Sequence, residues 1–241
     1  MTSGAGSGTV VVLDCDPDLG QELSVQELSA ARRKSLATTR RYDRGRWPAP
    51  PRTDANLGLL ITSGFVARAL SVGDCTGLEL LGPGDVLQPW VRPELEQSVA
   101  VATDWTVVQH MVVANLDGEF LARVSKWPQI VAALTRRLSL RTHSLLFQLT
   151  LAAFRRIDDR LLLMLWQFAD RWGTVTPRGV MVDIPLTHEL LAAAVGGRRP
   201  SVSGAVGRLV EQGQIRSLPR SRWLLLTPPS GDLHNHAKRT R

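Results

Sequence analysis

Nine polar or basic residues near the C-terminus have side chains of the kinds that bind nucleic acid. A guanidinium group can bind a guanine edge or a phosphate through two parallel hydrogen bonds, and hydroxyl and imidazole groups bind phosphate oxygens. The nine residues are Thr187, His188, Arg198, Arg199, Ser201, Ser203, Arg208, Arg220 and Arg222. On any basic surface such residues could be merely solvated, so the elements that carry them decide what they do.

Residues 186–215 have the pattern of two short helices joined by a tight turn. Thr187 is the expected N-cap of the first helix. The inward-facing residues of that helix are Leu190, Leu191, Ala194 and Val195. Gly196-Gly197 ends the helix, because glycine adopts left-handed backbone at little cost. Pro200 then suits the start of a second helix.

The second helix, Pro200–Gln212, has one apolar side and one small, polar and basic side. The inward positions are Val202, Val206, Leu209 and Val210, and the outward positions are Ser201, Gly204, Gly207 and Arg208. Gly213 ends this helix, and the following segment, Arg216–Leu226, is interrupted at Pro219 and is typical of a short hairpin. Helix, turn, helix and hairpin together predict a winged helix, whose second helix would enter a DNA major groove.

The positive charge of the chain is concentrated where the winged helix is expected. The 241 residues carry a formal net charge of +7. Residues 1–154 hold 15 Lys+Arg and 15 Asp+Glu, whereas residues 155–241 hold 14 and 7. This distribution is typical of a phosphate-binding module joined to a neutral regulatory or assembly domain.

Residues 57–110 consist of short apolar runs separated by Gly, Pro and Asp. Gly82-Pro83-Gly84-Asp85 is a strong turn signal between two of these runs. The pattern predicts an antiparallel β-barrel of the cupin or jelly-roll kind within an α+β protein, and small barrels often enclose one ligand. The barrel is therefore the expected place for a sensor pocket.

A helical period follows the barrel. An apolar stripe runs along a helix expected over Pro128–Arg156, and it consists of Ile130, Leu134, Leu138, Leu145, Leu149 and Ala152. At ~1.5 Å per residue this helix would be near 40 Å long, too long for a small barrel to cover. We expect the same helix of a second copy to cover the stripe, although packing on its own barrel is the alternative. Arg156–Asp159 is the expected hinge, with Asp158-Asp159 as the N-cap of an apolar helix over Arg160–Trp172, and a short strand is expected over Val180–Pro185.

Other chemistry has little support in the sequence. Asp14, Asp16 and Asp18 lack the distal Glu of a calcium loop, so this acidic turn is expected to cap a helix over Gln21–Thr39. The two cysteines match no metal or redox spacing, and the isolated His110 and His143 are weak evidence for haem ligation. A cupin-type enzyme would need clustered metal ligands, and the barrel region has one histidine. No catalytic residue, metal or cofactor is therefore expected.

The order of barrel, long helix, apolar helix and winged helix resembles the Crp/Fnr family of bacterial transcription regulators. LTHELLAAAVGGRRPSVSGAVGRL, residues 186–209, is the most specific match, and RLLLMLWQFADRWG, residues 160–173, is similar to the helix after the family's hinge. LGLLITSGFVAR and LLGPGDVL resemble its sensor barrel. The resemblance implies a homodimer bound to a near-palindromic operator, with RNA polymerase and an unknown small-molecule effector as further partners.

The cassette that holds a cyclic nucleotide in many members of that family is missing. The equivalent stretch, Pro93–Val107, has no Gly and no Arg, whereas a cyclic phosphate needs a basic or amide-rich cradle. Gly118-Glu119 and Arg123 come after the last barrel strands and are interpreted as a chance match. Cyclic AMP is therefore not the expected effector.

Arg199 is the residue expected to read a guanine edge, where a bidentate contact contributes about 1–3 kcal/mol of discrimination. The expected phosphate contacts are Thr187, His188, Ser201, Arg220 and Arg222. Pro200 and Gly204 stand where many members of the family have long polar side chains that contact bases. We therefore expect close approach of the backbone and DNA shape to contribute more to operator choice.

The predicted function is sequence-specific transcription regulation. A constitutive DNA-binding or architectural protein with a degenerate barrel, and a winged helix that contacts protein, remain alternatives.

The sequence predicts five regions: an N-terminal tail and helical segment at 1–45, the barrel at 46–125, the dimerisation helix at 126–157, the winged helix at 158–230 and a basic tail at 231–241. No apolar run approaches the ~20 residues that a bilayer requires, so no membrane association is expected. The expected location is the cytoplasm.

Overall fold

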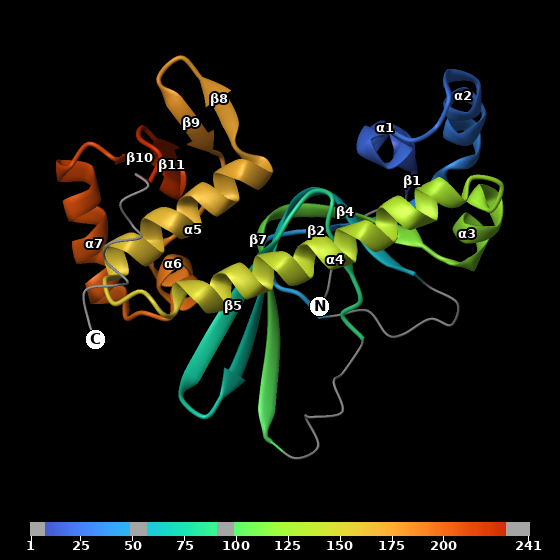
Figure 1. Cartoon of the computed structure of the whole chain (residues 1–241). Helices are drawn as coiled ribbons and strands as arrows, with labels where there is room; N and C mark the ends of the chain where they lie inside the picture. Colours follow the sequence, from blue (N-terminus) through green and yellow to red (C-terminus); the bar gives the residue numbers. More distant parts are fainter. Residues whose placement is uncertain (1–7, 49–56, 91–98, 230–241) are drawn as a thin grey trace. The chain divides into compact units, whose positions relative to one another are not determined.

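The computed structural model describes residues 8–48, 57–90 and 99–229 and contains two compact units (Figure 1). The N-terminal unit comprises Met1–Arg68 and Leu80–His143, and the C-terminal unit comprises Ala69–Glu79 and Ser144–Arg241. Within the described residues, no helix is long and apolar enough to cross a membrane.

An antiparallel sheet forms the centre of the N-terminal unit. Its strands are β1 (Gly8–Val11), β2 (Leu36–Tyr42), β3 (Gly45–Arg46), β4 (Gly58–Val72), β5 (Cys75–Leu81), β6 (Val86–Leu87) and β7 (Val101–Leu116). The order is β1-β2-β7-β4-β5, with β3 paired to β7 and β6 paired to β4. The α+β class and the antiparallel sheet agree with the prediction. The sheet does not close into the expected barrel within the described residues, because β1 and β5 end the path of pairing.

Gly64 allows β4 to pass close to β7. Its backbone has φ +79°, and a Cβ atom there would lie 1.9 Å from the carbonyl oxygen of His110. No side chain fits at that distance, so the approach of the two long strands depends on glycine.

The N-terminal segment differs from its prediction. It contains α1 (Val12–Cys15), the 3₁₀ helix η1 (Pro17–Gly20) and α2 (Val25–Lys34), followed directly by β2. The expected helix over Gln21–Thr39 is therefore too long at both ends. Ser24 caps α2 in a capping box with Glu27, and these hydrogen bonds hold the pKa of the Glu27 carboxyl below its ordinary value. Residues 36–40 alternate between exposed and buried side chains, which is a strand period.

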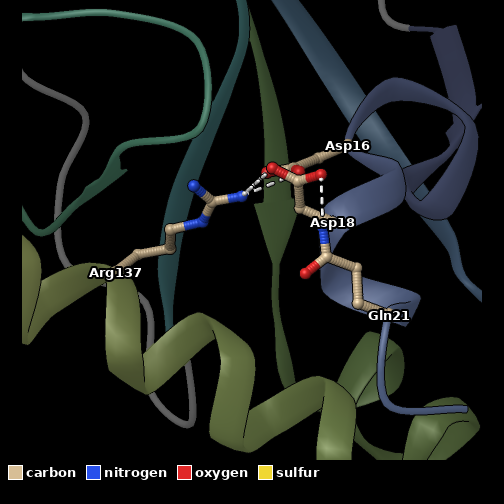
Figure 2. Close-up of polar contacts among 4 residues, drawn as sticks. All are labelled: Asp16, Asp18, Gln21 and Arg137. Carbon is tan, nitrogen blue, oxygen red and sulfur yellow. Dashed lines mark hydrogen bonds and ion pairs between the residues drawn. The ribbon is translucent and has the colours of Figure 1, made fainter. Parts of the chain in front are cut away.

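The acidic turn binds arginine instead of capping a helix. Arg137 of α4 (Pro128–Leu151) donates to Asp16 Oδ1 at 2.9 Å and to Asp18 Oδ2 at 3.4 Å, and Gln21 donates to Asp18 Oδ1 at 2.9 Å (Figure 2). Burial raises the pKa of the Asp16 carboxyl above its ordinary value, although the neighbouring guanidinium acts in the opposite direction. Asp14 pairs with Arg32 at 2.6 Å. These ion pairs fasten α1 and η1 to α2 and α4.

The expected dimerisation stripe divides into buried and exposed parts. Ile130 and Leu134 are fully buried in the core that α4 shares with α3 (Gly118–Val124) and the N-terminal helices, and Leu138 packs against that core. The N-terminal end of the stripe is therefore covered by its own unit. Leu145 is half-buried, Leu149 is 72% exposed, and Ala152 is exposed just beyond the end of α4.

The C-terminal unit contains the end of α4, three further α-helices and a small sheet. After α4, its elements are α5 (Ile157–Trp172), β8 (Thr174–Thr176), β9 (Gly179–Val182), α6 (His188–Ala194), α7 (Arg199–Glu211), β10 (Ile215–Leu218), η3 (Pro219–Ser221) and β11 (Arg222–Leu225). The antiparallel sheet has the order β10-β11-β9-β8. The predicted apolar helix and hairpin are present, while β8 was not predicted.

Candidate nucleic-acid interface

The turn between α6 and α7 is built from the residues that predicted it. Thr187 caps α6, and its hydroxyl accepts a hydrogen bond from the Leu190 amide at 3.3 Å. Gly196 has φ +62°, the left-handed backbone expected at the end of a helix. Helix α7 begins at Arg199, with Pro200 in its first turn. The predicted helix-turn-helix is therefore confirmed in its caps and turn.

The inner face of α7 fixes how this helix sits in the domain. Its buried residues are Val202, Ala205, Val206 and Leu209, spaced at three and four positions. Val210 was predicted to face inward but is 42% exposed, because one further residue rotates the side chain by about 100° away from that stripe. The predicted outward positions Ser201, Gly204, Gly207 and Arg208 are all exposed.

His188 and Ser203 join the two helices of the motif. The Nδ1 atom of His188 lies 2.9 Å from the Ser203 hydroxyl, and the His188 ring stacks on Trp223 with centroids 6.1 Å apart. Trp223 is buried and donates from Nε1 to the carbonyl oxygen of Leu186 at 3.2 Å. These contacts connect α6, α7 and β11, so His188 and Ser203 hold the helices in register in addition to any contact with phosphate.

Three arginines of the predicted interface carry uncompensated charge. Arg198, Arg199 and Arg220 are exposed, and none has an acidic partner among the described residues. Arg198 is the N-cap residue of α7 and Arg199 its first residue. Because the N-terminal end of a recognition helix is the end that meets base edges, this position suits a guanidinium that binds DNA.

The other two arginines are already engaged by carboxylates. Arg208 donates from Nε and Nη2 to the two oxygens of Asp158 at 2.9 and 2.6 Å. Arg222 donates to Asp183 at 3.3 Å and to the Pro219 carbonyl at 3.0 Å. Neither acidic partner was predicted from the sequence.

Asp158 is the acidic residue that organises the start of α5. The sequence placed an N-cap at Asp158-Asp159, but the N-cap is Arg156, and Asp158 lies in the first turn with 5% of its surface exposed. Hydrogen bonding to Arg208, and secondarily to Arg156, outweighs burial and holds the pKa of Asp158 below its ordinary value.

The tip of the β10–β11 hairpin has an unusual backbone. Arg220 and Ser221 have φ of 63° and 56°, a left-handed conformation that costs non-glycine residues about 1 kcal/mol each. The Leu186 amide donates to the Ser221 carbonyl at 2.9 Å, which ties the tip to the residue before α6. Exposed Arg216 on β10 and Arg178 between β8 and β9 add positive charge that was not predicted as part of the interface.

The residues considered for other chemistry have structural roles in the described part of the chain. Gly118-Glu119 begins α3, and Arg123 pairs with Glu119 at 3.4 Å and donates to the Leu36 carbonyl at 2.8 Å. His110 lies 2.9 Å from Asp43. No group of three or more His, Cys, Asp or Glu side chains that could hold a metal ion occurs in the described ranges. Residues 93–98, which begin the stretch equivalent to the missing cassette, lie outside these ranges.

Residues 159–230 match the family model of the Crp-like helix-turn-helix domain. The interface described above therefore lies within a recognised domain. No curated protein sequence matches the chain significantly.

Three solved structures illustrate the likeness of the whole chain. A CooA variant from Carboxydothermus hydrogenoformans is 20% identical, with a TM-score of 0.64, and the match covers 93% of this chain and 95% of that one. FixK2 from Bradyrhizobium japonicum is 16% identical, with a TM-score of 0.62 and coverage of 85% and 99%. A CRP/FNR-family transcriptional regulator from Thermus thermophilus is 20% identical, with a TM-score of 0.54 and coverage of 83% and 98%.

Proposed function

Since the chain combines a Crp-like helix-turn-helix domain with the fold of CRP/FNR regulators, we propose that it regulates transcription by binding a near-palindromic operator as a homodimer. The observation that carries this proposal is the N-terminal end of α7, where Arg198 and Arg199 are exposed and have no acidic partner among the described residues. Arg199 reads a guanine edge, and Arg198, Ser201 and Arg220 bind phosphates.

The outer face of α7 also suits close approach to the DNA backbone. Gly204 and Gly207 are exposed, and a Cβ atom at Gly207 would meet nothing within 4 Å. Local packing therefore does not require glycine at 207, although glycine within a helix costs about 1 kcal/mol relative to alanine. In our proposal, these positions leave room for the duplex, and DNA shape contributes to operator choice together with Arg199.

Selection of bound duplexes from a random DNA library tests the proposed function. We expect enrichment of a sequence with two inverted half-sites about one helical turn apart, because a two-fold dimer presents two recognition helices. The affinity for the enriched duplex should fall steeply with rising salt, since several phosphates are neutralised. A library that shows no enrichment would contradict sequence-specific binding, and a protein-contacting winged helix would bind no duplex.

The proposed dimer uses the exposed end of α4. Leu146 and Leu149 are 61% and 72% exposed, and Phe147 beside them is 36% exposed. Three large apolar residues within one turn of helix form a surface that water covers poorly, and the same surface of a second copy would bury it. The proposed interface is therefore the second half of α4 and does not include Ile130 or Leu134.

Leu146→Glu combined with Leu149→Glu should convert the protein from a dimer into a monomer. Each change places a charge at the interface, where an unpaired carboxylate is costly to bury. Sedimentation equilibrium should give twice the 26.4 kDa chain mass for the unaltered protein and a single chain mass for the variant. Val175→Glu, at another exposed apolar residue of the same unit, is the control and should stay dimeric. A variant that keeps the dimer mass would exclude this end of α4 as the interface.

In our proposal, regulation acts through the linker between α4 and α5. Helix α4 ends at Leu151 and α5 begins at Ile157, so five residues connect the dimer helix to the DNA-binding domain. A small-molecule effector that changed the packing of two α4 helices would change the spacing of the two recognition helices, and contact with RNA polymerase would follow operator binding. Operator affinity that is equal with and without cell metabolites would indicate a constitutive binder.

A further inference from the structure

Four arginines lie close together on the N-terminal unit, and we name them the arginine patch: Arg40, Arg41, Arg44 and Arg46. They occupy the end of β2, the following turn and β3, and all four are exposed. Residues 1–154 have no net charge, because acidic residues elsewhere in this part of the chain balance its basic residues. The net charge therefore does not reveal this local concentration of positive charge.

The arginine patch follows one strand of the sheet. Strands β2 and β3 both pair with β7, with Arg40 opposite Val113 and Arg46 opposite Thr106. Seven residue steps along β7 correspond to about 23 Å at ~3.3 Å per residue. Successive side chains of a strand point to opposite faces of the sheet, so Arg40 and Arg41 lie on the two faces of β2, at the end with which β1 does not pair among the described residues. The patch therefore extends along this edge over a length that can meet several phosphates of one DNA strand.

Little negative charge lies near the arginine patch. Asp43, the one acidic residue between its members, is 2.9 Å from His110 Nδ1. Arg46 approaches Asp104 at 3.5 Å, but the side chains are 87% and 60% exposed, so solvent screens this pair strongly. Among the described residues, Arg40, Arg41 and Arg44 have no acidic partner.

Several other arginines of the same unit have acidic partners, whereas Arg33 donates to the Ser29 hydroxyl. Arg32 binds Asp14, Arg136 binds Glu22, and Arg137 binds Asp16. The lack of partners in the arginine patch is thus a local feature and not a general property of arginines in this unit.

The side chains of the patch favour a phosphate partner over a protein partner. Guanidinium groups match the geometry of phosphate oxygens and bind them through paired hydrogen bonds. The centre of a protein interface needs apolar area, and none of the large exposed apolar side chains of the described residues lies between 40 and 46. We propose that the arginine patch binds the phosphate backbone of duplex DNA and is a second DNA-contacting surface outside the winged helix.

This inference rests on the proposed function, because it assumes that the chain is already held on DNA by its operator. Phosphate contacts carry no direct sequence information, so the patch adds affinity for the DNA that flanks the operator without changing base preference. Each phosphate contact adds about 0.9 to the slope of log affinity against log salt concentration. The affinity of the protein should therefore be higher for a duplex with flanking DNA, and the additional affinity should fall as the salt concentration rises.

The test compares two duplexes that carry the operator obtained by selection, one trimmed to the operator and one extended by two helical turns on each side. The full-length protein and the variant Arg40→Gln, Arg41→Gln, Arg44→Gln are titrated onto both at several salt concentrations. On the extended duplex we expect the variant to bind at least tenfold more weakly at low salt and to have a salt slope smaller by about 2 to 3 for each subunit of the proposed dimer. On the trimmed duplex the two proteins should bind equally.

A control variant removes the same charge elsewhere on the unit: Arg33→Gln, Lys34→Gln, Lys126→Gln, all at exposed positions. It should behave like the unaltered protein on the extended duplex. If both variants lose the same slope, the effect is one of net charge and the patch is not a site. Equal salt slopes of the patch variant and the unaltered protein on the extended duplex would overturn the inference. This holds even if the variant lost binding to an acidic protein, since the partner of the patch would then be a protein and not DNA. Failure of the unaltered protein to bind the trimmed duplex would instead overturn the proposed function.

Discussion

Arg199→Ala should weaken binding to the selected operator by about 5- to 150-fold per half-site and relax base preference at one position of each half-site. This range corresponds to the about 1–3 kcal/mol that a bidentate arginine–guanine contact contributes. Arg199 is exposed at the first position of α7 and has no acidic partner among the described residues, so its removal leaves no buried group unpaired. The free energy of unfolding should therefore change little, which separates loss of recognition from loss of structure.

Two further variants identify which property of Arg199 matters. Arg199→Lys keeps the charge but loses the forked geometry, so we expect most of the affinity for non-specific DNA to remain while base preference is relaxed. Arg198→Ala, one residue earlier, should weaken binding to all duplexes alike and lower the salt slope by about 1 for each subunit of the proposed dimer. Quantitative selection on each variant measures both effects. Unchanged base preference in Arg199→Ala would exclude base reading by this residue.

The winged helix could be predicted closely because its signals are local. The Thr187 hydroxyl accepts a hydrogen bond from an amide three residues away, Gly196 ends a helix within its own turn, and Pro200 lies in the first turn of the next helix. Helical spacing also identified most of the buried face of α7, although it missed Ala205 and wrongly included Val210 at the edge of that face. Such features depend on neighbours in sequence, so a single sequence contains them.

The contacts that position these elements could not be predicted in the same way. Asp158 and Arg208 are 50 residues apart, and Asp16 and Arg137 are 121 apart. Charge type alone does not choose among many possible partners over such separations. The open path of the N-terminal sheet among the described residues has the same origin, because closure depends on pairing between β1 and β5, which are distant in sequence. Apolar runs and turn signals predicted strands correctly but contained no information on which strands would be edges.

An ion pair between Asp158 and Arg208 links α7 to α5. The Asp158 side chain is 7% exposed and receives two hydrogen bonds from the Arg208 guanidinium, while Arg156 adds a third at 3.2 Å. The Arg208 side chain is 51% exposed, so solvent weakens the pair from its side. We propose that Arg208 orients the recognition helix and does not itself read bases.

The pair makes stability depend on pH in a defined direction. Its hydrogen bonds hold the pKa of Asp158 below the ordinary value in the folded protein. The unfolded chain therefore binds the proton more readily, and the carboxylate contributes stability above pH ~4. This contribution is lost as pH falls from about 4 through the lower folded pKa, while Arg208 stays protonated throughout.

Asp158→Asn should lower the free energy of unfolding of the C-terminal unit by about 1–3 kcal/mol at neutral pH, because the Arg208 guanidinium loses its charged acceptor. Urea unfolding followed by tryptophan fluorescence measures the difference, which should shrink below pH ~4. Asp159→Asn removes a second carboxylate from the same helical turn and should have the smaller effect of a helix-terminal charge, about 0.3–1 kcal/mol. Arg208→Gln should also destabilise the unit, and the double variant should lose less than both single changes added together. Additive losses would mean that the two residues act separately, and the recognition helix would then have to be oriented by its apolar face alone.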